Sequence, residues 1–406
     1  MHKIEKLLQT LAPKGVEFRK LGEMCEILDN RRIPIAKNKR NPGIYPYYGA
    51  NGIQDYIDSY IFDGDFVLVG EDGSVINKDN TPVVNWASGK IWVNNHAHVL
   101  QTKNELKLKF LYFYLQTIDV SYCVAGTPPK INQENLKKIT IPIPPLEIQQ
   151  EIVKILDAFT ELNTELNTEL NARKKQYQYY QNMLLDFNDA HSNHKDAKER
   201  LAQKTYPKRL KTLLQTLAPK GVEFRKLGEV INILKGKQLN KELLLDYGEY
   251  PVMNGGIHAS GYWNEYNTDY PKIIISQGGA SAGYVNYMTS KFWAGAHCYV
   301  IELNSEKLNY KFLYYFLKNS QIILMKSQFG AGIPALNKTD IETLTIPIPP
   351  LEIQQEIVKI LDAFTELNTE LNTELKARKK QYEYYREKLL TFKPLTPHTK
   401  KLKNEF

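Results

Sequence analysis

The sequence of 406 residues has few cysteines and no long apolar run. Its three cysteines, Cys25, Cys123 and Cys298, are far apart and odd in number, so they fit neither a zinc knuckle nor a disulfide framework, and we expect reduced, buried thiols. No apolar run approaches the roughly 18 residues that a membrane span needs. The first residues do not resemble a secretory signal, because no apolar core precedes a small-residue cleavage site. These absences predict a cytoplasmic protein without membrane association.

Motifs of the common enzyme classes are also missing. The sequence contains no GxxxxGK[ST] phosphate loop, no GxSxG, no HExxH, and no NPPY or DPPY loop of an amino-methyltransferase. The glycines within 278–283 do not match GxGxxG and are expected in a turn. The acidic pair Glu71 and Asp72 lacks the lysine spacing of a metal-dependent nuclease. We therefore predict a binding protein with no catalytic residue, no metal site and no cofactor.

The composition is typical of a globular protein. Hydrophobic residues make up 42% of the chain and charged residues 24%, and the length allows two or three domains. The net charge of +8 is concentrated, since segment 188–211 carries 7 − 3 = +4 and segment 392–406 carries 4 − 1 = +3. Charge alone is therefore weak support for DNA binding. His191 and His194 lack a further nearby ligand, which favours a solvated linker over a metal site.

The chain contains one unit twice. LLQTLAPKGVEFRKLGE occurs at 7–23 and 213–229, and TIPIPPLEIQQEIVKILDAFTELNTELNTEL occurs at 140–170 and 345–375. Between these identical borders the halves differ, yet a skeleton aligns: YPYYGANGI (45–53) with YPVMNGGI (250–257), WVNNHAHVL (92–100) with WAGAHCYVI (293–301), and KFLYFYL (109–115) with KFLYYFL (311–317). The pattern predicts one fold with two different surfaces.

Each variable region is expected to be a small α/β domain. The apolar, β-branched runs at 60–73 and 270–283 end in glycine-rich turns and indicate strands, whereas 109–117 and 311–319 indicate short helices. Long helices are expected at 146–187 and 351–391, because the IPIPP segment before each ends any earlier element.

Apolar residues along the first long helix follow the spacing of a coiled coil. One extra step of four, from Leu166 to Leu170, is a stutter that locally unwinds the supercoil. The 42 residues from 146 to 187 would span roughly 63 Å, and their striped face needs a partner, for which the second copy is the obvious candidate. The expected seam is Ile148, Ile152, Ile155, Phe159, Leu162, Leu166, Leu170, Arg173, Tyr177, Tyr180, Leu184 and Phe187.

The doubled TIPIPPLEIQQEIVKIL with its TEL repeats, the FRKLGE segments and the stretch YPYYGANGIQDYIDSYIFDGDFVLVGEDG resemble the specificity subunit of Type I restriction-modification systems. The resemblance covers essentially the whole chain. It implies a non-catalytic subunit in which two target-recognition domains, held apart by an antiparallel pair of long helices, each recognise one half of a split DNA sequence. It also implies two adenine methyltransferase (M) subunits as partners and, through them, two restriction (R) translocase and nuclease subunits.

The expected fold class is therefore α/β, with two small globular domains, an antiparallel two-helix coiled coil and a pseudo-twofold internal repeat. Two different surfaces on a fixed spacer should recognise an asymmetric, two-part site in double-stranded DNA. The predicted boundaries are 1–145 for the first domain, 146–187 for the central helix, 188–211 for the linker, 212–350 for the second domain, 351–391 for the distal helix and 392–406 for a basic tail.

Candidate DNA-binding residues lie in the variable regions. The stretch from Asn30 to Arg40 has five cations and no acid, which suits phosphates or guanine edges, although a solvated loop explains it equally well. Turns with amide or aromatic side chains could approach bases, as could the pair Glu71 and Asp72. The predicted residues are Asn30, Arg31, Arg32, Lys37, Asn38, Lys39, Arg40, Tyr48, Asn51 and Lys130 in the first domain, and Lys235, Lys237, Asn254, Gln277 and Lys338 in the second.

Some alternatives stay open on the sequence. His96 and His297 share a W-x-x-x-H frame, for which we expect buried, structural histidines. The identity of the two helix copies suits two equal partner subunits, but recent duplication or recombination explains it equally well. A stand-alone DNA-binding regulator and a protein scaffold compete with the specificity subunit as functions. Stable association with a methyltransferase would exclude the first, and salt-dependent, sequence-selective DNA binding would exclude the second.

Overall fold

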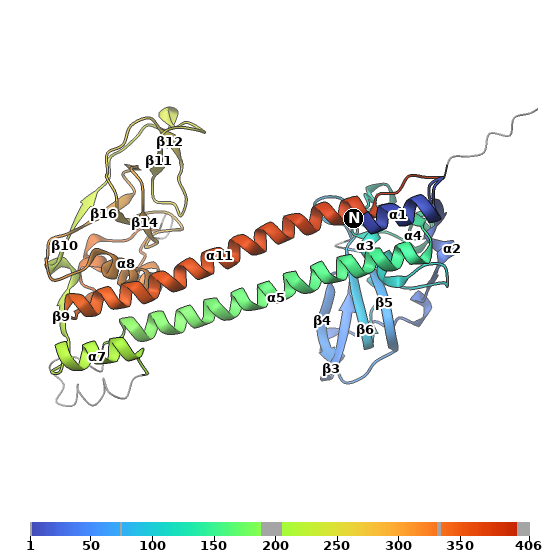
Figure 1. Ribbon diagram of the computed structural model, residues 1–406, viewed down its shortest axis with the longest axis horizontal. Coiled ribbons are helices and arrows are strands. Elements are labelled where there is room, and N and C mark those ends of the chain that lie inside the picture. Colours follow the sequence, from blue (N-terminus) through green and yellow to red (C-terminus); the bar gives the residue numbers. More distant parts are fainter. Residues whose placement is uncertain (1, 74, 188–204, 331–333, 396–406) are drawn as a thin grey trace, which may run out of the picture. The chain divides into compact units, whose positions relative to one another are not determined.

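The computed structural model describes residues 2–73, 75–187, 205–330 and 334–395 (Figure 1). The chain divides into two compact units, the first formed by Met1–Thr168 with Thr373–Phe406 and the second by Glu169–Asn372. Each of the two long helices therefore contributes one part to each unit. His191, His194 and the expected linker up to residue 204 lie outside the described residues, as does the expected tail from residue 396.

The body of the first unit is a six-stranded sheet in the order β2-β7-β5-β6-β3-β4. Its neighbours are antiparallel except β3 and β6, which are parallel. Both faces are covered, because alternate residues of β5 enter different apolar clusters: Val67 and Val69 one, Phe66 and Leu68 the other. The strands are β1 (Glu17–Lys20), β2 (Cys25–Ile27), β3 (Pro42–Gly49), β4 (Gly52–Ile57), β5 (Phe62–Gly70), β6 (Val84–Val93), β7 (Ala97–Thr102) and β8 (Thr140–Ile143), and the short helices are α1 (His2–Leu11), α2 (Leu21–Met24), α3 (Leu108–Leu115) and α4 (Gln133–Lys138).

The second unit repeats this strand order with one interruption. A four-stranded sheet runs β10-β16-β13-β14 and a three-stranded sheet runs β12-β11-β15, so β14 and β15 together occupy the place of the single strand β6. Pro271 directly precedes β13 and has no N–H to donate, and the ladder between β13 and β14 begins at Lys272. The strands are β9 (Glu223–Lys226), β10 (Ile231–Lys235), β11 (Tyr250–Met253), β12 (Gly261–Trp263), β13 (Lys272–Ser276), β14 (Val285–Met288), β15 (Trp293–Ala294), β16 (Cys298–Leu303) and β17 (Thr345–Ile348).

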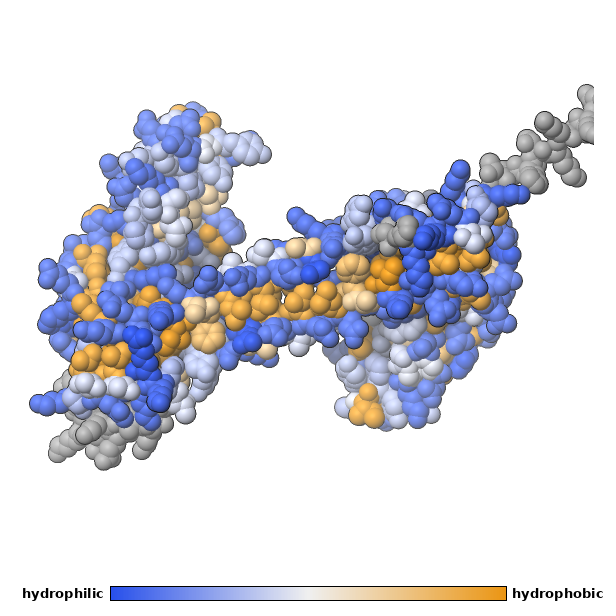
Figure 2. All heavy atoms as spheres, viewed as in Figure 1, coloured by the Kyte–Doolittle hydropathy of each residue, from blue (hydrophilic) through white to orange (hydrophobic). Residues whose placement is uncertain are grey.

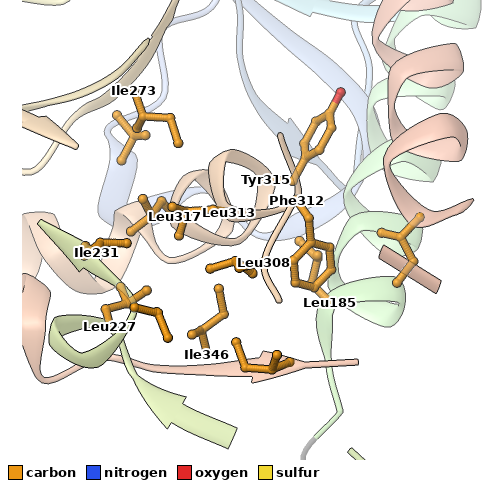
Figure 3. Packing of buried hydrophobic residues seen from close by; sticks show 14 of the residues in the cluster. Leu185, Leu227, Ile231, Ile273, Leu308, Phe312, Leu313, Tyr315, Leu317 and Ile346 are labelled. Atoms are coloured by element: carbon orange, nitrogen blue, oxygen red, sulfur yellow. The ribbon is translucent and has the colours of Figure 1, made fainter. Parts of the chain in front are cut away.

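The core of the second unit lies between the four-stranded sheet and its helices. Figure 3 shows Leu313 and Leu317 of α8 on the side of Ile273 of β13 and Ile231 of β10. Phe312 lies on the other side, beside Leu185, and all of these side chains are buried. The expected short helices at 109–117 and 311–319 are confirmed as α3 and α8. The helices are α7 (Lys208–Leu217), α8 (Tyr310–Asn319), α9 (Gln321–Lys326) and α10 (Lys338–Glu342).

Each variable region enters and leaves through the same two-stranded ladder. EFRK of β1 pairs with TIPI of β8, and the identical EFRK of β9 pairs with TIPI of β17 in the same register. A fully buried glutamine fixes the helix that follows: Gln149 accepts from the Lys107 amide at 2.8 Å and donates to the Pro144 carbonyl at 2.7 Å. Gln354 makes the equivalent bonds to the Asn309 amide and the Pro349 carbonyl. The identical segments thus form identical structures.

The predicted long helices are confirmed as α5 (Leu146–Leu185) and α11 (Leu351–Leu390). In the first unit, Phe159 of α5 stacks on Tyr385 of α11 with ring centroids 5.5 Å apart. In the second unit, Tyr180 of α5 stacks on Phe364 of α11 at 5.1 Å. The early part of each helix therefore packs on the late part of the other, as an antiparallel pair requires. Figure 2 shows apolar side chains following both helices.

The apolar face of α5 is wider at its start than the predicted seam. Leu156 was not expected there, yet it is fully buried with Ile148 and Ile152 in the core of the first domain, while Phe159 contacts α11. The face widens because this part of the helix packs against both the domain and the second helix.

No helix among the described residues is long and apolar enough to cross a membrane.

The three cysteines are unpaired and buried, as expected. Burial raises the pKa of Cys25 to about 12 and that of Cys298 to about 11. Both thiols therefore stay protonated near neutral pH, which makes them poor nucleophiles.

Candidate nucleic-acid interface

A short loop between β6 and β7, Asn94–His96, connects three other loops of the first domain; we call it the hub loop. Its Asn94 amide donates to the Tyr48 carbonyl at 3.0 Å, and its His96 carbonyl accepts from the Glu71 amide at 2.8 Å. The Asn95 carbonyl accepts from Arg32 at 3.4 Å. Segments near residues 32, 48 and 71, which are far apart in the sequence, therefore meet at one end of the domain.

Charged side chains fill this end. Glu71 lies 2.6 Å from Arg32 Nη1 and 3.1 Å from Lys130 Nζ, with its own side chain only 12% exposed. Arg32 also lies 3.4 Å from Asp29 and donates to the Ala97 carbonyl at 2.8 Å. The predicted residues Arg32 and Lys130 are thus brought together, but both are bound to an acid of the domain itself.

A buried histidine completes this network. His98, fully buried in β7, bonds through Nδ1 to Asp29 at 2.6 Å and through Nε2 to the Ile131 carbonyl at 2.7 Å. Burial alone would raise the pKa of Asp29, but the hydrogen bond and charge of His98 and the charge of Arg32 hold it below its usual value. Asp29, Glu71 and His98 have the ligand types of a metal site, yet Arg32 and Lys130 already supply the compensating positive charge.

The expectation of a buried His96 and a buried His297 is wrong. The His96 side chain is 47% exposed and bonds to Asp72, and His297 is exposed as well. The buried position is two residues later, because β7 begins at Ala97 and directs His98 toward the interior. Its counterpart in β16, Tyr299, donates to the Leu336 carbonyl at 3.1 Å, as His98 does to Ile131.

The second domain has the same hub loop, Gly295–His297, with different side chains. The backbone N–H of Gly295 donates to the Met253 carbonyl at 2.8 Å, and the backbone N–H of Gln277 donates to the His297 carbonyl at 2.8 Å. The predicted residue Asn254 supports this loop, since its Oδ1 accepts from the His297 amide at 3.2 Å. In the first domain Asn94 does this from within the loop, and a Cβ at Gly295 would collide with Asn254.

Matching backbone bonds identify equivalent positions at the two ends. Gln277 stands where the first domain has Glu71, Gly278 where it has Asp72, and Tyr299 where it has His98. At its hub loop the first domain thus carries carboxylates, whereas the second domain carries the side-chain amide of Gln277. Glu71 is paired with the cations Arg32 and Lys130. A carboxylate accepts hydrogen bonds, for example from the cytosine amino group, whereas an amide can both donate to and accept from adenine.

The other predicted residues of the first domain are spread over its surface. Asn30, Asn51, Lys37, Asn38 and Lys39 are exposed, and no ion pair of the two lysines occurs within the described ranges. Arg31 lies over the Phe62 ring at 4.7 Å, and Arg40 lies over the Tyr47 ring at 4.1 Å with Asp55 at 3.4 Å. Tyr48 is buried, and burial raises its pKa.

In the second domain, Lys235 and Lys237 line a cavity of about 320 Å³ together with Lys272 and Glu302. Lys272 is paired with Glu302 at 3.0 Å, whereas the other two lysines have no ion pair with any described residue. Lys338 begins α10 and lies 3.3 Å from Glu342. Lys235 and Lys237 are therefore the predicted cations of this domain that are available to an anion.

Comparison with known proteins decides the family. A family model described as the Type I restriction modification DNA specificity domain matches residues 13–175 and again residues 219–379. The chain belongs to this family. It is thus a Type I restriction-modification specificity subunit, which is a non-catalytic subunit, and the predicted family resemblance is confirmed.

Relatives match this specificity subunit over nearly its full length. A putative type I restriction enzyme specificity subunit from Haemophilus influenzae is 34% identical over 416 residues, covering 96% of this chain and 98% of the relative. The specificity subunit of EcoR124I and EcoR124II from Escherichia coli is 27% identical over 422 residues and covers 98% of both chains. The crystal structure of a Type I system S subunit from M. genitalium has the same fold, with a TM-score of 0.68 at 21% identity, covering 93% of this chain and 96% of that one.

Sequence reasoning missed the central role of the hub loop in this specificity subunit. His96 and His98 were not among the predicted DNA-binding residues, although the aligned segments WVNNHAHVL and WAGAHCYVI contain the loop in both domains. The alignment of the two segments contained a usable signal, because His96 is a histidine in both copies whereas His98 is replaced by Tyr299. The shared histidine is the exposed one, and the position that differs between the domains is the interior one.

Proposed function

We propose that the specificity subunit recognises an asymmetric, two-part site in double-stranded DNA, with one domain bound to each half. The observation that carries this proposal is the segment bonded to each hub loop. The backbone bond is the same in both domains, but the segment holds Glu71 and Asp72 in the first domain and Gln277 and Gly278 in the second. Two domains with the same backbone arrangement but different side chains suit two half-sites of different sequence. A symmetric site would require like side chains.

Exposed cations would supply the sequence-independent part of binding. Lys37 and Lys39 in the first domain and Lys235 and Lys237 in the second are exposed and free of ion pairs with other described residues, so each can contact a phosphate. Arg31, Arg40, Lys130 and Lys338, together with Asn30, Asn51, Tyr48 and Asn254, stay candidates for contacts or for support of the loops. Arg32 would act by holding Glu71 in place.

The long helices would set the gap between the half-sites. A helix of 40 residues is about 60 Å long, and one turn of B-DNA is about 34 Å, so the gap would correspond to about one to two turns. In the complex, we propose that two methyltransferase (M) subunits bind the specificity subunit and that two restriction (R) subunits join through them. The assembly would act on cytoplasmic DNA.

The test is to express the subunit with the methyltransferase of the same system and to map methylated adenines in the host DNA. One split motif, with two unlike halves around a fixed gap, supports the proposal. A palindromic motif contradicts the assignment of unlike half-sites. A chain that binds DNA selectively but forms no complex with the methyltransferase contradicts the assembly and favours a stand-alone regulator.

A further inference from the structure

The cavity of about 320 Å³ in the second domain lies on the face of the four-stranded sheet that is turned away from the helices. Alternate residues of β16 show this, because Ile301 packs in the core with α8, whereas Val300 and Glu302 line the cavity. The paired strands on either side contribute Leu234 of β10 and Lys272 of β13. The cavity is therefore formed within one domain, on three adjacent strands.

In the first domain, an aromatic side chain fills the equivalent place. The strand pairings match Lys272 to Phe66, and they match Leu234 to Leu28. Phe66 is buried and packs edge to face on Phe62, with ring centroids 5.3 Å apart. Leu28 is only 7% exposed, whereas Leu234 is 47% exposed. The same residue type thus lies in a filled space in one domain and beside an open space in the other.

The two acids of the cavity already have cationic partners. Glu302 lies 3.0 Å from Lys272, which also lines the cavity. Asp269 lies 3.8 Å from Lys291. The negative charges of the lining are therefore balanced by lysines of the same domain.

Two further lysines give the cavity an excess of positive charge. Lys235 and Lys237 line it, are exposed, and form no ion pair with another described residue. Counted from the matched leucines, Lys235 stands where the first domain has Asp29, so the charge at this strand end is opposite in the two domains. An anion that enters the cavity meets two lysines whose charge is not balanced.

The lining suits a phosphate group that has a further chemical part attached. Lysine ammonium groups donate charge-assisted hydrogen bonds to phosphate oxygens. The volume of about 320 Å³ lies within the range of small-molecule sites, which leaves room for a sugar or a base beside the phosphate. Leu234 and Val300 offer an apolar surface to that part.

The cavity lies beside the hub loop of the second domain. The backbone N–H of Lys237 donates to the Ala294 carbonyl at 2.8 Å, and Ala294 directly precedes the hub loop. A phosphate of DNA bound at the hub loop and the phosphate of a free nucleotide could therefore both reach this site.

We propose that the cavity binds one phosphate group through Lys235 and Lys237, with the attached part of the ligand against the apolar wall. The phosphate belongs either to the backbone of bound DNA or to a free nucleotide. Binding of a DNA phosphate rests on the proposed function, whereas binding of a nucleotide does not. Because Phe66 fills the equivalent place in the first domain, the site belongs to the second domain alone.

Filling the cavity tests the proposal in the full-length chain. Lys272→Phe places the aromatic residue of the first domain in the cavity and removes one positive charge. Lys272→Gln is the matched control, because it removes the same charge and leaves the cavity open. Isothermal titration calorimetry measures binding of AMP and of adenosine, which lacks the phosphate, and fluorescence anisotropy measures binding of duplex DNA that carries the mapped methylation motif.

A second pair of variants removes the two lysines themselves. Lys235→Ala with Lys237→Ala is compared with Lys241→Ala combined with Lys326→Ala. The control lysines are exposed residues of the same domain that form no ion pair with any described residue. Thermal unfolding of each variant reports whether the fold is retained.

If the ligand is a free nucleotide, AMP binds the unmodified chain and adenosine does not. Lys272→Phe and the Lys235/Lys237 double variant should then weaken AMP binding at least about tenfold, and both controls less than about threefold. If the phosphate comes from DNA, AMP does not bind. The same two variants should then weaken duplex binding about tenfold and lower its salt slope by about one unit.

The proposal is overturned if Lys272→Phe weakens neither AMP binding nor duplex binding more than Lys272→Gln does. It is also overturned if the Lys235/Lys237 variant binds both ligands as tightly as its control. A chain that binds no DNA selectively contradicts the proposed function instead, and binding of AMP then decides the role of the cavity by itself.

Discussion

Replacing Glu71 by glutamine tests whether the charged network at the first hub loop is as important as its geometry suggests. Glutamine is the residue at the equivalent position of the second domain, Gln277, so it fits the shared backbone frame. The substitution removes the charge that faces Arg32 at 2.6 Å and Lys130 at 3.1 Å. Arg32, whose side chain is 11% exposed, would then depend on Asp29 and on carbonyl groups alone.

The expected cost follows from these contacts. Removing one partner of a buried ion pair costs about 3–5 kcal/mol. The glutamine oxygen still accepts one hydrogen bond, and Asp29 still balances Arg32, so we expect about 2 kcal/mol for Glu71→Gln. In a unit of this size that corresponds to a melting temperature lower by about 4–8 °C. Lys130 becomes available for a phosphate, so the dependence of DNA affinity on salt steepens by up to about one unit of slope.

Differential scanning calorimetry and a salt series of DNA-binding measurements give the two readouts. Glu26→Gln is the matched control, because Glu26 lies on an exposed edge of β2 in the same domain and forms no ion pair with another described residue. If Glu71→Gln melts within about 1 °C of this control, the network does not stabilise the domain and the reasoning is refuted. A loss of stability without a change in salt slope would exclude only the role of Lys130.

Three other perturbations have defined outcomes. The double variant Lys37→Glu and Lys39→Glu should weaken binding to specific and unrelated DNA alike and lower the salt slope by about two units, measured by fluorescence anisotropy. Gln277→Ala should relax the specificity of one half-site only, seen in methylation maps as degenerate positions there. The pKa of Asp29 is lowered in the folded state, so its ionised carboxylate stabilises the fold when the pH is above the unfolded-state pKa of about 3.9. The stability difference between the native chain and Asp29→Asn should therefore shrink as the pH falls from 5 toward 3, and a constant difference in acid unfolding would contradict this.

A further change tests the spacer. Adding one Thr-Glu-Leu-Asn unit to both long helices lengthens each by about 6 Å and rotates its far end by about 40°. We expect the methylated half-sites to lie farther apart, whereas an unchanged gap would show that the helices do not set it.

The long helices were predictable to within two residues because their signals are local. The IPIPP segment fixes each start, and a heptad spacing runs without a break except at the stutter. Leu156 was missed because its burial comes from a domain that packs on the helix, which no spacing within the helix reveals. Its neighbour Phe159 was predicted because the contact with the second helix follows the period.

The site was less predictable, because its residues come from separate segments. Arg32 and Lys130 looked like free cations, and only the fold shows that Glu71 lies between them. His96 was expected to be buried, whereas the buried histidine is His98, because the sequence does not show that the strand begins only at Ala97. Asn254 was predicted to bind DNA, and in the structure its side chain supports the hub loop of the second domain.

The two-stranded ladder at the base of each domain has an evolutionary consequence. EFRK and TIPI are identical in both copies and pair in the same register. A variable segment that starts after the first of these strands and ends before the second is therefore connected to the same two-stranded ladder in either copy. Gln149 and Gln354 fix the helix beyond that ladder in the same way. A new variable segment could therefore be exchanged into either position without redesign of the helices, and under the proposed function each exchange would change the half-site that this domain recognises.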